Sequence, residues 1–164
     1  MAEAAQTEAD FPWLAAAIDL SRQCPPSASA FSVGAVLVAA DGSVIATGYS
    51  RERDPHDHAE EVALARAAAA PPDGETPGEA ARRLAKATIY SSLEPCLRRL
   101  SRPRSCCELI VAAGIRRVVL AWLEPPLFVP GGGARWLREQ GVTVAELPEL
   151  AAEARAVNAH LLAG

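Results

Sequence analysis

The sequence lacks a strong charge of either sign and lacks any long apolar run. Sixteen Lys and Arg residues stand against 20 Asp and Glu residues, a formal net charge of -4, which argues against a nucleic-acid partner because such partners require a basic surface. No stretch reaches the roughly 18 uninterrupted apolar residues that a membrane span needs. The acidic start MAEAAQTEAD also lacks the basic and apolar regions of a signal peptide. We therefore expect a cytoplasmic protein.

Length and composition are those of an ordinary globular chain. Apolar residues make up 50% of the 164 residues and charged residues 22%, which excludes wholesale disorder. We expect one domain over residues 1–164, with a core over about residues 10–146 and a C-terminal helix over 148–162. A chain of this length buries a core without a disulfide or a structural metal, so any metal here is expected to serve chemistry.

Cysteine is scarce but clustered. The chain has four, Cys24, Cys96, Cys106 and Cys107, and a reducing compartment disfavours a disulfide framework among them. Three of the four fall within the short segment 96–107. This clustering calls for a chemical explanation.

Hydrophobic periodicity and breaker residues predict alternating helices and strands. An Asp41-Gly42 pair between two β-type runs indicates a hairpin. The expected strands are 33–39, 44–49, 87–91, 117–122 and 142–145, and the expected helices are 12–23, 58–70, 79–85, 106–113, 134–140 and 148–162. This alternation predicts an α/β sheet covered by helices on both sides.

Several potential metal ligands occur at the predicted ends of these elements. His58-Ala59-Glu60 opens a helix, Pro95-Cys96 lies at a strand-to-helix junction, and Cys106 or Cys107 opens a later helix. One imidazole and two thiolates leave a fourth zinc position open, which is typical of a catalytic site, and helix N-termini favour thiolates. A neighbouring carboxylate that binds no metal suits proton transfer, so we assign this role to Glu60.

A His-x-Glu followed by Pro-Cys and a further Cys is the pattern of zinc nucleobase deaminases, and the chain resembles the cytidine/deoxycytidylate deaminase superfamily. The segments SLEPC, CELIVAAGIRRVVLAWLEP, VPGGGARWLREQGVTV and EARAVN are most similar to the pyrimidine deaminase domain of riboflavin-biosynthesis enzymes. The segment AFSVGAVLVAADGSVIATGYS is similar to the first hairpin of free cytidine deaminases. The resemblance implies a three-layer α/β/α cytidine-deaminase-like fold with a mixed five-stranded sheet, one Zn²⁺ per chain, and a homodimer or homotetramer.

Carried over by position, the resemblance makes His58, Cys96 and either Cys106 or Cys107 the zinc ligands, with Glu60 as the proton shuttle. In the riboflavin-type domains the last ligand stands eight residues before the glycine that corresponds to Gly114, which favours Cys106. Cys107 is then a core neighbour without a role in the metal site.

The chain departs from the riboflavin-type pattern in three places. Ala30 stands where many members have a substrate-holding Asn, and Glu124-Pro125-Pro126-Leu127 replaces an Asp-Pro-Asn-Pro linker. The loop LRRLSRPRS is one residue longer and lacks the His-Gly-Arg-Thr-Pro-Pro segment. Its arginines suit a substrate phosphate or merely solvate a surface loop. The expected substrate-binding residues are Ala30, Ala59, Pro95, Arg98, Arg99 and Arg102.

The resemblance implies a hydrolytic deaminase that converts an amino group on a pyrimidine-type ring to a carbonyl and releases ammonia. Two substrates compete: a cytosine nucleoside or nucleotide, and the phosphoribosylamino-pyrimidine of riboflavin synthesis, acted on by a deaminase that stands without the usual reductase domain. The alternatives are a non-catalytic zinc-binding scaffold of the same fold and a tRNA or nucleobase deaminase. The presence of Glu60 argues against a non-catalytic scaffold, which would not need this carboxyl group. The acidic net charge argues against a tRNA substrate.

Overall fold

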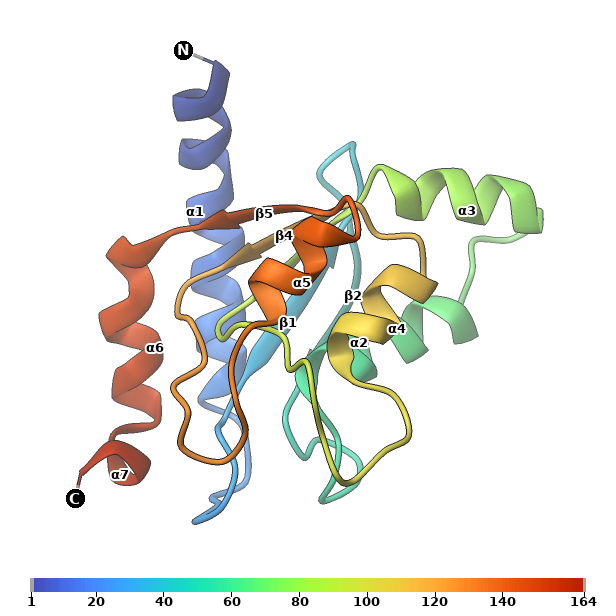
Figure 1. Cartoon of the computed structure of the whole chain (residues 1–164). Helices are drawn as coiled ribbons and strands as arrows, with labels where there is room; N and C mark the ends of the chain where they lie inside the picture. Colours follow the sequence, from blue (N-terminus) through green and yellow to red (C-terminus); the bar gives the residue numbers. More distant parts are fainter. Residues whose placement is uncertain (1, 164) are drawn as a thin grey trace.

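The computed structural model describes residues 2–163 and consists of a central sheet between two layers of helices (Figure 1). The strands are β1 (Gly34–Val38), β2 (Val44–Tyr49), β3 (Thr88–Ser91), β4 (Arg117–Leu120) and β5 (Thr143–Glu146). The helices are α1 (Ala2–Ser21), α2 (Ala59–Ala69), α3 (Pro77–Ala85), α4 (Cys106–Ala112), α5 (Gly133–Glu139), the 3-10 helix η1 (Pro148–Leu150), α6 (Ala151–Val157) and α7 (Ala159–Leu162).

The strand order brings several chain ends to one edge of the sheet. The order is β2-β1-β3-β4-β5, with β1 antiparallel to both β2 and β3, and with β3, β4 and β5 parallel. Because β2 and β3 both oppose β1, they run in the same direction as β4. The carboxyl ends of β2, β3 and β4 therefore meet at one edge, which is where α/β sheets form their ligand sites.

Alternating side chains along the strands supply both faces of the sheet, so the expected mixed five-stranded, three-layer fold is confirmed. Val36, Tyr90 and Val119 belong to one buried cluster, together with residues of α1 and α6. Their neighbours in the chain, Leu37, Ile89 and Val118, belong to a second cluster, together with residues of α4 and α5. This alternation is the two-residue period of a strand buried on both faces.

The start of α2 lies directly against β2, and glycine permits this approach. A Cβ added at Gly48 would lie 2.5 Å from the carbonyl oxygen of Ala59, well inside van der Waals contact. Any larger residue would push the head of α2, and the His58 that precedes it, away from the sheet.

The first helix is longer than the predicted 12–23 segment, because it begins at Ala2 and keeps Pro12 inside it. Residues 2–11 are mostly good helix formers, and Asp10 ties this part of α1 to the sheet. The Asp10 carboxylate accepts hydrogen bonds from the Tyr90 hydroxyl at 2.7 Å and from both terminal nitrogens of Arg117 at 2.9 and 2.7 Å. These contacts of Asp10 with the sheet thus offset the loss of the helical hydrogen bond that Pro12 removes.

The prediction of one continuous C-terminal helix over 148–162 is wrong, because the structure divides it into η1, α6 and α7. Asn158 interrupts the segment: its side-chain amide accepts from the backbone of Ser32 at 2.7 Å and donates to the Ser32 carbonyl at 3.0 Å. The core also extends beyond residue 146, since Ala151 and Ala154 are buried in the first cluster. Within residues 2–163, no helix combines the length and the apolarity needed to cross a membrane.

Candidate metal centre and active-site cavity

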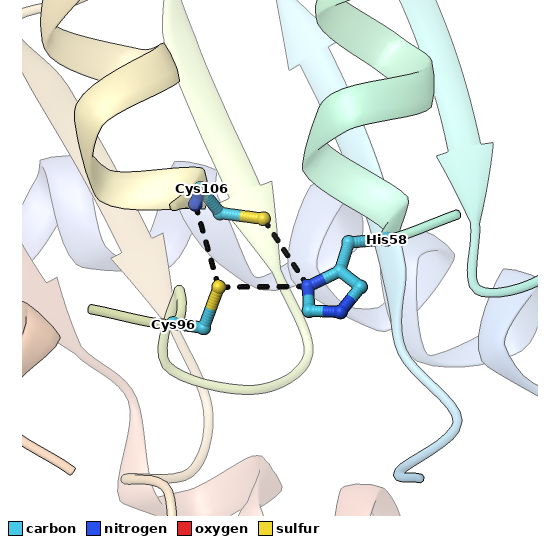
Figure 2. Close-up of side chains that lie close together, drawn as sticks. All are labelled: His58, Cys96 and Cys106. Carbon is cyan, nitrogen blue, oxygen red and sulfur yellow. Dashed lines mark hydrogen bonds between the residues drawn. The ribbon is translucent and has the colours of Figure 1, made fainter. Parts of the chain in front are cut away.

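Three element ends bring an imidazole and two thiols together. His58 precedes α2 as its N-cap in an extended conformation, Cys96 follows β3 in the turn Glu94-Pro95-Cys96, and Cys106 is the first residue of α4. Figure 2 shows the three side chains pointing toward one another from these separate segments.

The distances in this group fit a zinc ion. The Nδ1 atom of His58 lies 3.5 Å from the Sγ of Cys96 and 3.4 Å from the Sγ of Cys106, and all three donor atoms lie within 4.8 Å of one another. Tetrahedral zinc with ordinary Zn–N and Zn–S bonds separates such a nitrogen and sulfur by about 3.6 Å. The residues therefore fit zinc without rearrangement.

The electrostatic environment favours a thiolate at Cys96. The hydrogen bond with Cys106 lowers the pKa of Cys96 most, His58 lowers it further, and the result is about 4 although burial opposes it. The backbone N–H of Cys106 also donates to the Cys96 sulfur at 3.3 Å. The pKa of Cys106 is raised, first by its hydrogen bond to Cys96 and then by burial. A divalent cation between the two sulfurs would stabilise both as thiolates.

Cys107 points elsewhere and is part of the core. Its thiol donates to the carbonyl oxygen of Pro95 at 3.3 Å, it is fully buried, and burial raises its pKa. A Cβ added at Gly133 would lie 3.0 Å from this sulfur and 2.0 Å from the Pro95 oxygen. The start of α5 thus packs against the turn that carries Cys96, and Cys107 fills the space between them.

Glu60 is buried beside His58 and Cys96, with 3% of its surface exposed. The Ser91 hydroxyl lies 2.7 Å from both its Oε1 atom and the carbonyl oxygen of Leu93. Burial raises the pKa of Glu60. The Ser91 hydroxyl thus holds one carboxylate oxygen in place, in a group that also lines the cavity.

A cavity of about 300 Å³ opens onto these groups. His58, Glu60 and Cys96 line it together with Phe31 and Phe128, whose rings contact edge to face with centroids 5.1 Å apart. The lining of the cavity thus combines aromatic side chains with titratable groups. Such a site suits a small, flat, polar ring.

Only three of the six predicted substrate-binding residues line the cavity. Ala30, Ala59 and Arg99 line the cavity. Pro95, Arg98 and Arg102 are not among the lining residues: Pro95 is buried in the turn before Cys96, and Arg98 is exposed.

Arg102 is occupied by an ion-pair network at the head of α2. Its guanidinium contacts Glu61 at 3.2 Å, Asp54 at 3.3 Å and Asp57 at 3.6 Å. Glu61 also accepts from the backbone N–H of His58 at 3.2 Å. Arg102 therefore holds the loop between the two cysteine ligands against the segment that carries His58.

Arg99 differs from the other arginines of this loop because it is buried and only partly bonded. Its side chain is 3% exposed, and one terminal nitrogen donates to the His56 carbonyl at 2.7 Å. The same nitrogen lies 3.4 Å from Glu61. The Nε and the other terminal nitrogen have no hydrogen-bond partner, so this cation retains donors for a ligand.

Sequence reasoning missed the site residues Glu94, Ser91, Phe31 and Glu124. Ser91 carried a weak signal, since it follows Ile89 by two positions and so shares the face of β3 that contacts α2. Glu94 is almost buried, and its carboxylate accepts from the backbone N–H groups of Glu124 at 3.0 Å and Ala134 at 2.8 Å. Nothing in the sequence indicates these contacts across 30 and 40 residues.

Comparison with known proteins is consistent with this geometry. Residues 7–122 match the model of the family described as cytidine and deoxycytidylate deaminase zinc-binding region. The chain is 41% identical over 130 residues to the diaminohydroxyphosphoribosylamino-pyrimidine deaminase of Schizosaccharomyces pombe, covering 79% of this chain and 30% of that protein. It is 35% identical over 113 residues to the riboflavin biosynthesis protein RibD of Aquifex aeolicus, covering 69% of this chain and 27% of the relative.

Solved structures show the same likeness. Acinetobacter baumannii RibD superposes with a TM-score of 0.73 and 26% identity, over 96% of this chain and 40% of that one. The Aspergillus oryzae Rib2 deaminase superposes with a TM-score of 0.70 and 25% identity, over 92% of this chain and 97% of that one. The chain thus spans less than a third of the curated relatives named above. With its family match, its fold and its grouped ligand atoms in agreement, the chain belongs to the zinc-binding cytidine and deoxycytidylate deaminase family.

Proposed function

We propose that this protein is a zinc-dependent hydrolytic deaminase of an aminopyrimidine. The observation that carries the proposal is the position of Glu60, whose buried carboxyl group lines the same cavity as His58 and Cys96. A scaffold that only bound metal would gain nothing from burying a carboxyl group there.

His58 through Nδ1 and the thiolates of Cys96 and Cys106 hold the zinc ion in this proposal. When bound by one imidazole and two thiolates, zinc supplies a Lewis acid that activates water near neutral pH. The remaining chemistry is proton transfer, which this chain's own residues perform.

Glu60 accepts the proton that water loses, gives it to the ring nitrogen, and later delivers a proton to the departing amino group. The overall reaction consumes one water and exchanges the ring amino group for a carbonyl and ammonia. Ser91 suits both protonation states of Glu60: it donates to Oε1 when Glu60 is ionised and to the Leu93 carbonyl when Glu60 is protonated. Burial raises the pKa of Glu60, which brings it closer to the working pH of a general acid and base.

The finer part of the proposal concerns the substrate. The names of the similar proteins specify a pyrimidine that carries a phosphoribosylamino group. Arg99 lines the cavity, and its Nε and one terminal nitrogen have no hydrogen-bond partner, so an arginine suited to a phosphate is present at this site. We therefore favour this phosphorylated aminopyrimidine over a cytosine nucleoside.

An ammonia-release screen tests the proposal. Purified protein, with its zinc content measured on the same sample, is assayed on cytosine, cytidine, CMP, dCMP, guanine and the phosphoribosylamino-pyrimidine. We expect release of ammonia from the last compound. A zinc-loaded protein that releases none from any of them would be a scaffold, and the proposal would be wrong.

Arg99→Gln and Arg98→Gln form a matched pair for the phosphate. Arg99→Gln should raise the KM of the phosphorylated substrate about 10-fold or more and leave the KM of its dephosphorylated form unchanged. Arg98→Gln, at an exposed position, should change neither. Equal losses on both forms of the substrate would contradict a phosphate contact.

Exposed apolar residues on the two loops beside the cavity support a further proposal, that the chain forms a homodimer or homotetramer. Leu100 is fully exposed, and Leu127 and Phe128 are 50% and 41% exposed, and burial of such side chains against a second copy would be favourable. Light scattering after size exclusion measures the mass of the assembly. The cytoplasmic location and the single-domain organisation stay predictions.

A further inference from the structure

One wall of the cavity comes from a loop without helix or strand. Residues 25–33 connect the end of α1 to β1. The members of this loop that line the cavity are Ser29, Ala30, Phe31 and Val33. Phe31 is buried, and its ring contacts the rings of Trp122 and Phe128 edge to face, with centroids 5.4 and 5.1 Å apart. Because a loop lacks the regular backbone bonds of a helix or sheet, other groups have to hold this ring in place.

The guanidinium of Arg51 bonds to both ends of the loop. Its Nε and one terminal nitrogen donate to the Pro25 carbonyl at 3.1 and 2.8 Å. The same terminal nitrogen donates to the Ser32 hydroxyl at 2.8 Å, and the other donates to the Phe31 carbonyl at 3.1 Å. The planar fork of arginine can span three such acceptors, which a single ammonium group cannot do. Arg51 therefore ties the start of the loop to Phe31.

The backbone of Arg51 has an unusual conformation that is itself held by hydrogen bonds. Its φ is 59°, and among residues 2–163 it is the only residue other than glycine with a positive φ. A left-handed residue with a Cβ is strained, and such strain persists where the surroundings determine the conformation. The N–H of Arg51 donates to the Asp57 carbonyl at 2.9 Å. The preceding residue, Ser50, bonds to Val33 through its N–H at 2.9 Å and its hydroxyl at 3.0 Å.

Two residues of the C-terminal segment also contact the loop, but from outside the cavity. Asn158 bonds to the backbone of Ser32, and the Nε2 atom of exposed His160 lies 2.9 Å from the Ser27 carbonyl oxygen. Of these three groups, Arg51 alone lines the cavity together with Phe31. Arg51 is thus the contact that holds the loop on the side where a ligand would bind.

The hydrogen bonds of Arg51 also indicate which role it has. All three nitrogens of its guanidinium donate to the loop, whereas Arg99 has two nitrogens without a partner. An arginine whose donors are already used by the protein is suited to holding structure rather than to binding a ligand.

We infer that Arg51 is a positioning residue, which fixes the Phe31 wall of the cavity by bonding to both ends of the 25–33 loop and so sets the affinity for the substrate ring. The part of this inference that concerns the substrate rests on the proposed function. Arg51 touches no reacting atom and acts through Phe31. A shift of a binding wall by about 1 Å is enough to lower the rate by up to about 100-fold.

Hydrogen exchange tests the hold on the loop without any ligand. Arg51→Gly removes the side chain and relieves the backbone strain, because glycine adopts a positive φ freely, so the fold should be retained. Exchange measured by mass spectrometry on the zinc-loaded protein should become about 10-fold faster at the amides of residues 27–33 and stay unchanged in β4. Arg51→Lys, which donates from one nitrogen, should show a smaller increase. Arg135→Ala, at an exposed arginine of α5, should show none.

A double-variant cycle tests whether Arg51 acts through Phe31. Arg51→Gly and Phe31→Ala should each raise the KM of the phosphoribosylamino-pyrimidine about 10-fold. The double variant should raise it no further than the larger single effect, since both changes remove the same wall. Partial loss of the folded population would instead lower the apparent kcat and leave KM unchanged.

The outcomes separate this inference from the proposed function. Exchange of residues 27–33 at the wild-type rate in a folded Arg51 variant overturns the inference, as do KM effects that multiply in the double variant. If Arg51→Gly fails to fold, Arg51→Lys carries both measurements. If the wild-type protein releases ammonia from no compound, the proposed function fails, and the exchange experiment alone decides whether Arg51 holds the cavity wall.

Discussion

The backbone N–H of Cys106 donates to the sulfur of Cys96 at 3.3 Å, so the first turn of α4 stabilises negative charge on its neighbouring ligand. The next residue along, Cys107, donates its own thiol to the Pro95 carbonyl. Two adjacent cysteines therefore face different partners: Cys106 points toward His58 and Cys96, and Cys107 points toward Pro95.

Cys106→Ser should lose most of its zinc after dialysis, because a serine hydroxyl does not replace a buried thiolate as a ligand. Cys107→Ser should keep close to one zinc per chain, since its side chain faces Pro95. Metal content by atomic emission measures both. If Cys107→Ser loses zinc while Cys106→Ser retains it, the ligand assignment is reversed.

Chelation should lower the stability of the wild-type protein and of Cys107→Ser. Zinc binds the folded chain better than the unfolded one, so its removal withdraws that binding free energy. Thermal unfolding with and without chelator gives the shift in Tm. Cys106→Ser serves as the control, and a chelator effect of the same size in that variant would contradict the proposed zinc site.

Glu60→Gln should lower kcat by about 100- to 10,000-fold, the usual contribution of a general acid and base. The amide keeps the size of the side chain but transfers no proton, so zinc content should stay at the wild-type level. Ser91→Ala, which removes the hydroxyl beside Oε1, should reduce kcat by a smaller factor. Full activity in Glu60→Gln would exclude the proposed proton transfer.

Glu94→Gln should destabilise the fold by about 2 kcal/mol, because one of two buried acceptor oxygens becomes a donor that faces a backbone N–H. The affected bonds hold the loop between β4 and α5 to the Cys96 turn. Urea unfolding measures the loss. Glu139→Gln, at an exposed glutamate of α5, is the control, and an equal effect in both would argue against this role of Glu94.

Tyr90→Phe should cost about 1–2 kcal/mol at pH 7, and this difference should shrink at alkaline pH. Burial, and then the hydrogen bond to Asp10, raise the pKa of Tyr90 above its ordinary 10.0. The folded state thus favours the neutral phenol, so its stabilisation is complete below about pH 10 and declines as the pH rises toward the folded-state pKa. Urea unfolding at pH 7 to 11 compares the two proteins, and a constant difference would contradict the raised pKa.

Local patterns were sufficient to predict most of the elements. The strand predicted over 44–49 matches β2 at both ends, because the Asp-Gly turn before it and the polar loop after it are local signals. The C-terminal segment is the instructive failure. Its apolar positions favour one helix, but Asn158 bonds to Ser32, 126 residues away in sequence, and that contact ends α6.

By itself, the sequence determined the kinds of ligand and their places at the ends of elements. Histidine, cysteine and glutamate were identifiable because helix starts and strand ends have local signatures. It also predicted the sheet, since near-continuous apolar runs are typical of strands that are buried on both faces.

Only the tertiary structure decided which groups face the cavity. Adjacent residues of a helix point about 100° apart, so the docking of α4 decides between Cys106 and Cys107. The loops that carry Arg99 and Glu124 have no periodicity that would orient a side chain. Their contacts with residues far away in sequence, Arg99 with His56 and Glu124 with Glu94, place both side chains at the cavity that His58, Glu60 and Cys96 line.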